Sequence, residues 1–319
     1  MNIRLLKSEL NKIFRTSKNK HAAHKNSCYL LEDCADDLDF LKDCVNHMVF
    51  SSRDGIQSGF YPQPGAMLAR TANFEVVLNV WFPHRKNILD QSTKAIHHHG
   101  NLLLSTVTIF GSGYTHWIFS KPKKYKQNQY NMEVIESEIH PAGHVGFVGN
   151  QIPHCPFYPK DLSITLCVWS TADKTSWVDH MKANSVVQYL KHYFFPFEPD
   201  RVKSFLNKLG LLKKLNINEI ELFDFYPDND SFRGMIEREE FLRGPNYFQV
   251  QGLLYLLQKT QINIFDEKLS RIMDDSFNSD SKQLFKKYLK GDEMSVPFFK
   301  GHELNHTIFN RSDIIKASN

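Results

Sequence analysis

The sequence predicts an α+β protein in which helical segments precede and follow a central zone of antiparallel strands. Three zones differ in hydrophobic periodicity: residues 1–65 and 173–319 carry apolar residues at helical spacing, whereas residues 66–172 carry short runs of β-branched and aromatic residues. The chain has 319 residues, of which 41% are hydrophobic and 23% charged, so it exceeds one average domain and has ample apolar surface to bury.

The N-terminal zone is expected to form two amphipathic helices followed by a turn-rich segment. Apolar residues recur at helical spacing within residues 3–14 and again within residues 38–49, and glycines and prolines interrupt residues 55–65. Basic residues are in excess in the first 27 residues, where Glu9 is the single acidic residue. The net charge of +4 is too small to indicate nucleic-acid binding, so this surplus is assigned to a solvated helix surface.

The central zone predicts many short strands, which is typical of an antiparallel sandwich or barrel. The strands are separated by turns rich in Gly, Pro and Lys, and the lysine-rich residues 121–126 are expected at an exposed hairpin tip. The expected strands comprise residues 74–82, 102–110, 114–119, 132–139, 145–148 and 162–171.

The C-terminal zone returns to helical periodicity, and we expect it to pack on the strand-rich zone as a lid or as the surface of a homodimer. No low-complexity linker separates it from the strands. Its apolar sets lie within residues 186–194, 202–212, 248–257, 265–273 and 284–289.

Cysteine usage and hydropathy predict the compartment. The five cysteines are odd in number and irregular in spacing, which favours free thiols in a reducing compartment. The sequence shows neither a membrane span nor a signal-peptide core, so a cytoplasmic location without membrane association is expected. The absence of a basic helix-turn-helix pattern argues against nucleic acid as a partner and favours a small-molecule substrate.

Histidines carry the strongest functional signal. His97 and His99 would point to the same side of a strand, with His98 pointing oppositely, and His154 follows in a later strand. Two imidazoles from one strand and a third from a neighbour form a facial set for a divalent metal and leave coordination positions open, as a catalytic metal requires. His84 and His116 are expected instead to be hydrogen-bonded pocket or surface residues.

These histidines lie in two segments that resemble the cupin superfamily motifs, which span about a third of the chain. In the first motif His97 and His99 match the His-x-His pair and Gly111 matches the later glycine, while Leu103 or Leu104 stands where the family has an acid. In the second motif Gly143 and His154 match. The remaining positions differ, with Gly149, Gln151 and Tyr158 in place of the proline, glycine and asparagine.

The resemblance implies a cupin-type β-barrel (a double-stranded β-helix), and the missing acid points to the three-His thiol dioxygenase branch, typified by cysteine dioxygenase. That branch implies Fe(II) held by three histidines, with O2 as co-substrate. Three neutral ligands leave the full charge on the metal, which favours a small polar or anionic metabolite that binds it directly. The alternative metals are Zn, Mn and Ni in a non-oxidative isomerase or hydrolase. A non-enzymatic cupin sensor or binding module is a further alternative.

Three other residues are candidates for binding or proton transfer. Tyr114 and Tyr158 are expected to line the pocket, as is Trp169, and a phenol near the reacting atoms could donate a proton. Arg85 could hold a substrate carboxylate in a bidentate contact. Cys155, which follows His154 directly, should face away from the metal and pack in the core.

A second motif near the end of the chain is judged to be coincidental. His302, Glu303 and His306 form the His-Glu-x-x-His pattern of zinc proteases, in which a helix places both histidines on one face. The 13 residues that follow contain neither His nor Glu to serve as a third ligand. This tail is therefore expected to cap the barrel with Phe298 and Phe299 buried.

Overall fold

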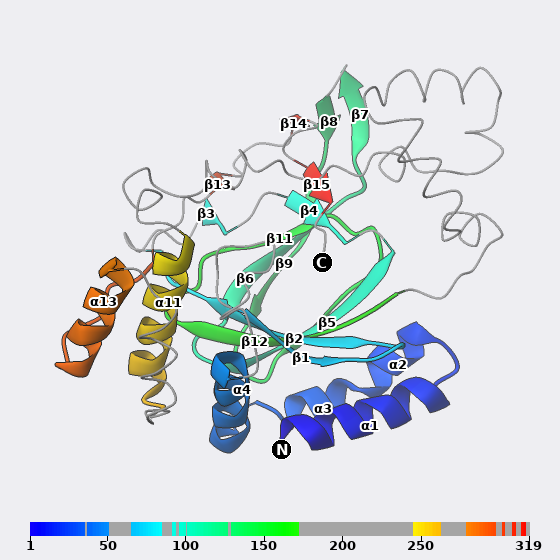
Figure 1. Cartoon of the computed structure of the whole chain (residues 1–319). Helices are drawn as coiled ribbons and strands as arrows, with labels where there is room; N and C mark the ends of the chain where they lie inside the picture. The colour runs from blue at the N-terminus through cyan, green and yellow to red at the C-terminus, as the bar shows by residue number, and fades with distance from the viewer. Residues whose placement is uncertain are drawn as a thin grey trace, which may run out of the picture. The chain divides into compact units, whose positions relative to one another are not determined.

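A computed structural model of the chain shows a strand-rich core that helices precede and follow in the sequence (Figure 1). By its internal contacts the chain divides into two compact units, Met1–Thr171 with Pro227–Asn319, and Ala172–Tyr226, and the second lies outside the described residues. The structure describes residues 1–35, 37–50, 65–84, 91–93, 96–99, 101–126, 129–171, 245–262, 279–297, 302–303, 308–310 and 314–316.

Four helices form the N-terminal segment. The first begins where the side chain of Asn2 accepts a hydrogen bond from the backbone N–H of Leu5 at 2.8 Å, and it buries Leu6, Leu10 and Phe14 in the main core. The amphipathic helix predicted within residues 3–14 is therefore confirmed, although its apolar residue Leu5 is 47% exposed. The helices are α1 (Ile3–Thr16), α2 (Lys20–Asn26), α3 (Cys28–Glu32) and α4 (Leu38–Phe50).

The first of two five-stranded sheets is antiparallel throughout and joins the main hydrophobic core. Its order is β1-β2-β12-β5-β10, and its two central strands, β12 and β5, are buried over almost their whole length. Alternate residues on β12, such as Ile164, Leu166 and Val168, pack in the same core as the buried faces of α1 and α4. The strands are β1 (Gly65–Arg70), β2 (Glu75–Trp81), β5 (Leu102–Phe110), β10 (Val145–Val148) and β12 (Ser163–Thr171).

The second sheet has the order β15-β4-β11-β6-β9. Its neighbours pair antiparallel except at one edge, where β15 pairs parallel with β4 through Ile315 and His97. The edge strand β15 comes from near the C-terminus, whereas its neighbour β4 precedes residue 100. The strands are β4 (Ile96–His98), β6 (Tyr114–Phe119), β9 (Val134–His140), β11 (His154–Pro156) and β15 (Ile314–Lys316).

The α+β prediction is confirmed, but the prediction of a closed barrel is corrected. The hydrogen-bonded ladders of the described strands end at β1 and β10 in one sheet and at β15 and β9 in the other. The chain crosses between the sheets in a tight turn after His140, where the N–H of His144 donates to the carbonyl of Pro141 at 3.0 Å. The sheets therefore meet through side chains rather than through continuous backbone pairing.

The strands predicted in the central zone agree closely with the described strands. The predicted strands 102–110, 114–119 and 145–148 coincide with β5, β6 and β10, and those predicted at 74–82, 132–139 and 162–171 overlap β2, β9 and β12. The lysine-rich segment belongs to a hairpin, as predicted, but it forms the strand β7 (Lys123–Lys126), which pairs with β8 (Gln129–Asn131), rather than the tip, and residues 127–128 lie outside the described residues. The strand β1 and the short strands formed by the C-terminal tail were not predicted.

The turn between β5 and β6 shows why Gly111 stands in the first motif. Its φ angle is +92°, and a Cβ atom there would lie 1.9 Å from the carbonyl oxygen of Leu162. Gly113 has a φ of +76°, and its Cβ would lie 1.9 Å from the carbonyl oxygen of His140. Neither position accepts a side chain, so the two glycines let this hairpin approach β12 and the end of β9.

Two described helices and three short strands come from the C-terminal zone. The helices α11 (Pro245–Thr260) and α13 (Ser279–Leu289) confirm two of the predicted apolar sets, and Tyr255 of α11 contacts Phe82 with ring centroids 5.8 Å apart. The sets at 186–194, 202–212 and 265–273 lie outside the described residues. The zone is not wholly helical, because β13 (His302–Glu303), β14 (Ile308–Asn310) and β15 are strands.

The strand β13 argues against a zinc-protease site at His302 and Glu303. Its residues pair antiparallel with β3 (Gln91–Ser92) and are extended, whereas that chemistry needs a helix to align the two histidines. His306 lies outside the described residues, as do Phe298 and Phe299.

The five cysteines are free thiols, as predicted. Of the described helices, none has the length and hydropathy needed to cross a membrane.

We expect acid to destabilise the protein through His24 of α2. This residue is fully buried and bonds the hydroxyls of Ser105 and Ser170 at 2.8 and 2.9 Å. Burial lowers its pKa from 6.5 to about 4, so the unfolded chain binds more protons between these values. The free energy of unfolding should therefore fall by on the order of 3 kcal/mol as the pH drops through this window.

Urea unfolding across this pH range measures the effect. His24→Gln keeps a hydrogen-bonding side chain but removes the titration, so its stability should depend less steeply on pH. An equal slope in both proteins would contradict the assignment.

Candidate metal centre

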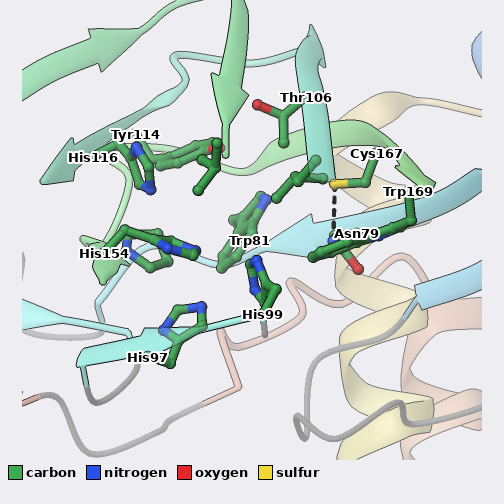
Figure 2. Close-up of a pocket in the computed structure, with 13 residues that line it drawn as sticks. Asn79, Trp81, His97, His99, Thr106, Tyr114, His116, His154, Cys167 and Trp169 are labelled. Carbon is green, nitrogen blue, oxygen red and sulfur yellow. Dashed lines mark hydrogen bonds between the residues drawn. The ribbon is translucent and has the colours of Figure 1, made fainter. Parts of the chain in front are cut away.

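Three buried imidazoles converge because of strand register. His154 of β11 pairs directly with His97 of β4, and His99 follows two residues after His97 on the same side. One nitrogen from each ring lies within 4.8 Å of the nitrogens of the other two. The three side chains are between 2% and 6% exposed. The convergence predicted from the sequence is therefore present in the fold (Figure 2).

The ring of His154 is held in an orientation that suits a ligand. Its Nδ1 lies 2.8 Å from the backbone carbonyl oxygen of Ile152, which can accept a hydrogen bond only from a protonated nitrogen. The Nε2 atom then carries the lone pair. This pairing of a ligating histidine with a backbone carbonyl is the usual way in which the ring tautomer at a metal site is fixed.

The close packing of the three rings favours neutral imidazoles around a cation. Ring centroids lie 4.3 Å apart for His97 and His154, 4.5 Å for His99 and His154, and 5.0 Å for His97 and His99. At such separations two imidazolium ions repel by roughly 4 kcal/mol at an effective dielectric constant of about 20. Neutral rings avoid that cost and offer lone pairs, so the donor set fits a divalent metal ion.

The histidines line a small cavity between the two sheets, with a volume of about 40 Å³. Trp169 of β12 closes it beside His99, with ring centroids 4.4 Å apart. The space holds a few water molecules or a compact ligand group. The cavity is lined by Asn79, Trp81, His97, His99, Leu104, Thr106, Tyr114, His116, Val148, His154, Pro156, Cys167 and Trp169.

The described lining contains no carboxylate and no Lys or Arg side chain. Opposite the histidines two polar groups are paired. Asn79 Nδ2 donates to Cys167 Sγ at 3.2 Å (Figure 2). Trp81 Nε1 donates to Thr165 Oγ1 at 2.8 Å. A cation at the histidines would therefore dominate the electrostatic field in the cavity, because nothing in the described wall offsets its charge.

Tyr114 occupies the position predicted for it in the cavity wall. Its ring lies 5.2 Å from that of Trp81 and 6.3 Å from that of His116. Burial raises the pKa of its phenol well above the ordinary value, and a hydrogen bond with Thr106 only partly opposes that shift. The hydroxyl therefore stays protonated at neutral pH and can act as a hydrogen-bond or proton donor.

His116 is a fourth imidazole in the cavity. Its ring centroid lies 5.2 Å from that of His154, but it is not part of the group whose nitrogens converge. Its position as a buried pocket residue agrees with the sequence interpretation.

Other predicted residues lie elsewhere or outside the described part of the chain. Tyr158 is not in the described cavity lining; it packs in the main core against His84, with ring centroids 5.0 Å apart. Cys155 packs with Ile96 and neighbouring apolar side chains, as predicted for the residue facing away from the metal. Arg85 lies outside the described residues. His98 is buried but does not line the cavity.

Sequence reasoning missed most of the wall opposite the histidines. Asn79 and Trp81 alternate on β2, and Cys167 and Trp169 alternate on β12, so one face of each strand points into the cavity. The other faces pack in the main core. Both faces of β12 mix apolar and hydroxyl side chains, so the sequence does not show which face of the strand lines the cavity. Only the tryptophans, Trp81 and Trp169, could have indicated that face.

Comparisons with known proteins give partial likenesses. No family model matches the chain, and no curated protein matches it. Among solved structures, the cupin domain of Cnp3 from Schizosaccharomyces pombe is similar over 34% of this chain and 64% of that chain, at 10% identity and a TM-score of 0.25.

Two similar structures are enzymes. The ribosomal oxygenase YcfD from Escherichia coli matches over 37% of this chain and 28% of that chain, at 14% identity and a TM-score of 0.23. The DMSP lyase DddQ from Ruegeria pomeroyi DSS-3 matches over 36% of this chain and 49% of that chain, at 8% identity and a TM-score of 0.24. This chain spans less than two thirds of the length of each of the three. Values this low transfer no activity, so the chemistry rests on the described residues.

Replacing a converging histidine should remove bound metal. We expect His97→Gln and His154→Gln each to lose one equivalent of divalent metal per chain, because two imidazoles bind a metal far more weakly than three. Metal content after equilibrium dialysis measures the loss. His116→Gln serves as the matched control, since it alters a buried histidine outside the converging group and should keep the metal. Full retention by His97→Gln would show that the rings do not share an ion.

Proposed function

We propose that the protein is a metal-dependent enzyme whose centre, made by His97, His99 and His154, holds Fe(II) and uses O2 to oxidise a small polar or anionic metabolite. The observation that carries this proposal is the convergence of three neutral ligands in a cavity whose described lining has no carboxylate. Bound iron would supply the one-electron chemistry that O2 requires.

The charge of the site favours a substrate with an anionic donor group. Neutral ligands leave the full divalent charge on the metal, whereas a carboxylate ligand would cancel part of it. Since the described wall offers no Lys or Arg side chain, a thiolate, carboxylate or phenolate would find its counter-charge at the metal itself. Direct attachment also places the reacting group beside the metal, and proximity of this kind accounts for much of enzymatic acceleration.

The walls limit what can react and supply a proton donor. A cavity of about 40 Å³ bounded by Trp81 and Trp169 accepts a compact reacting group and leaves little room for water. Tyr114 keeps its proton because it is buried, so its hydroxyl can donate a hydrogen bond to an oxygen atom on which negative charge develops. The neighbouring Thr106 hydroxyl can orient that phenol.

Oxygen uptake by metal-loaded protein tests the proposal. The purified chain, stripped with chelator, should consume O2 after loading with Fe(II) in the presence of a mercapto-carboxylate, an α-hydroxy-carboxylate or a catechol, and should consume none after loading with Zn(II). Turnover by iron-free protein loaded with Zn, Mn or Ni would instead establish the non-oxidative isomerase or hydrolase. Binding of these anions without turnover under any metal would favour the sensor or binding module.

The phenol of Tyr114 provides a second test. Tyr114→Phe removes one hydroxyl and should lower kcat by about 10²-fold or more, the range for loss of a positioned proton donor, with metal content unchanged. Tyr125→Phe is the matched control, because Tyr125 is 53% exposed on β7 and should leave kcat unaltered. Equal rates for the two variants would remove Tyr114 from the reaction.

A further inference from the structure

A second group of potential ligands lies at the edge of the second sheet, where β9 ends. Glu138 and His140 come from β9, and His144 comes from the turn that leads to β10. Glu138 Oε2 lies 3.8 Å from His140 Nε2 and 3.6 Å from His144 Nε2. None of the three belongs to the cavity lining described above.

The local backbone explains why these side chains meet. Residues two apart on a strand share a face, which aligns Glu138 with His140. The turn then reverses the chain: Gly143 has a φ of +79°, and its N–H donates to the carbonyl of Thr108 at 2.9 Å. This turn places His144 beside His140, and their ring centroids lie 4.4 Å apart.

Gly146 provides the space that the His140 ring occupies. A Cβ atom at Gly146 would lie 2.5 Å from His140 Cε1 and 3.0 Å from Nδ1, so any other residue would displace the ring. The ring is further enclosed by Tyr114 and His116, at centroid distances of 5.2 and 5.1 Å. Its Nε2 therefore faces Glu138 because the surrounding residues leave the imidazole little freedom.

Hydrogen bonding within the described residues does not account for this arrangement. His140 Nδ1 is buried without a hydrogen-bond partner there, and the distances from Glu138 to both rings exceed hydrogen-bond length. A cation held between Glu138 Oε2 and the Nε2 atoms of His140 and His144 would account for the approach of the three groups without a direct hydrogen bond.

We propose that Glu138, His140 and His144 form a second divalent metal site that prefers Zn(II). Two imidazoles and one carboxylate are a common zinc donor set, and ligands of a tetrahedral zinc lie about 3.4 Å from one another. The observed separations of 3.6 and 3.8 Å need only a small contraction. The side chains of Glu138 and His144 are 47% and 32% exposed, so water can reach the remaining coordination position.

Counting bound metal in the full chain tests this site. With Zn(II), and with Co(II) as a spectroscopic probe, the protein should bind two equivalents per chain. Glu138→Gln and His144→Gln should each lower the affinity for one equivalent by at least tenfold and leave the other unchanged. Both residues are accessible to solvent, so the variants should fold. Glu136→Gln is the matched control, because it removes an exposed acid two residues earlier on β9.

The outcomes separate the two sites. If Glu138→Gln and His144→Gln still bind two equivalents as tightly as the original protein, the second site does not exist. If the original protein binds one equivalent that disappears in His97→Gln, the central site stands and the second is overturned. If the one equivalent disappears in His144→Gln and survives in His97→Gln, the second site stands and the proposed function loses its metal.

Discussion

The pairing of β11 with β4 is the constraint on which the central site depends. β11 has only three residues, and it lies between β4 and β6, with His154 opposite His97 on one side and Ile118 on the other. A shift of one residue would turn His154 into the apolar cluster and place Cys155 in the cavity. Burial of Cys155 against Ile96 opposes that shift, so the hydrophobic face of the strand fixes the position of the metal ligand on its other face.

The two candidate sites differ in the electrostatic environment that they offer a cation. The central one is built from buried histidines and uses neutral donors only, so a metal there keeps its charge for a bound anion. The edge site includes Glu138, which is exposed, and a metal there would be partly neutralised and hydrated. A buried centre of undiminished charge therefore favours direct binding of an anionic substrate more strongly than the edge site does.

Sequence patterns predicted features that depend on neighbouring residues and missed those that depend on distant pairing. The segments that form β5 and β6 are rich in β-branched and aromatic residues, and the placement of His97 and His99 on one face follows directly from strand geometry. The parallel pairing of β15 with β4 joins segments more than 200 residues apart in a ladder of three pairs, which no local pattern encodes. Tyr158 was placed in the cavity by motif position, but β11 ends at Pro156 and alternation does not continue to it.

A continuous row of aromatic rings links the two sites through the second sheet. The centroid of His116 lies 5.2 Å from that of His154 and 5.1 Å from that of His140, and His140 packs on Tyr114 at 5.2 Å. Among the described strands, β9 is an edge strand that pairs with β6 alone, and its last residue, His140, lies opposite Tyr114. A cation bound at the end of β9 would therefore contact an imidazole that packs directly on the phenol proposed to donate a proton. The two sites are thus joined by direct ring contacts within one sheet.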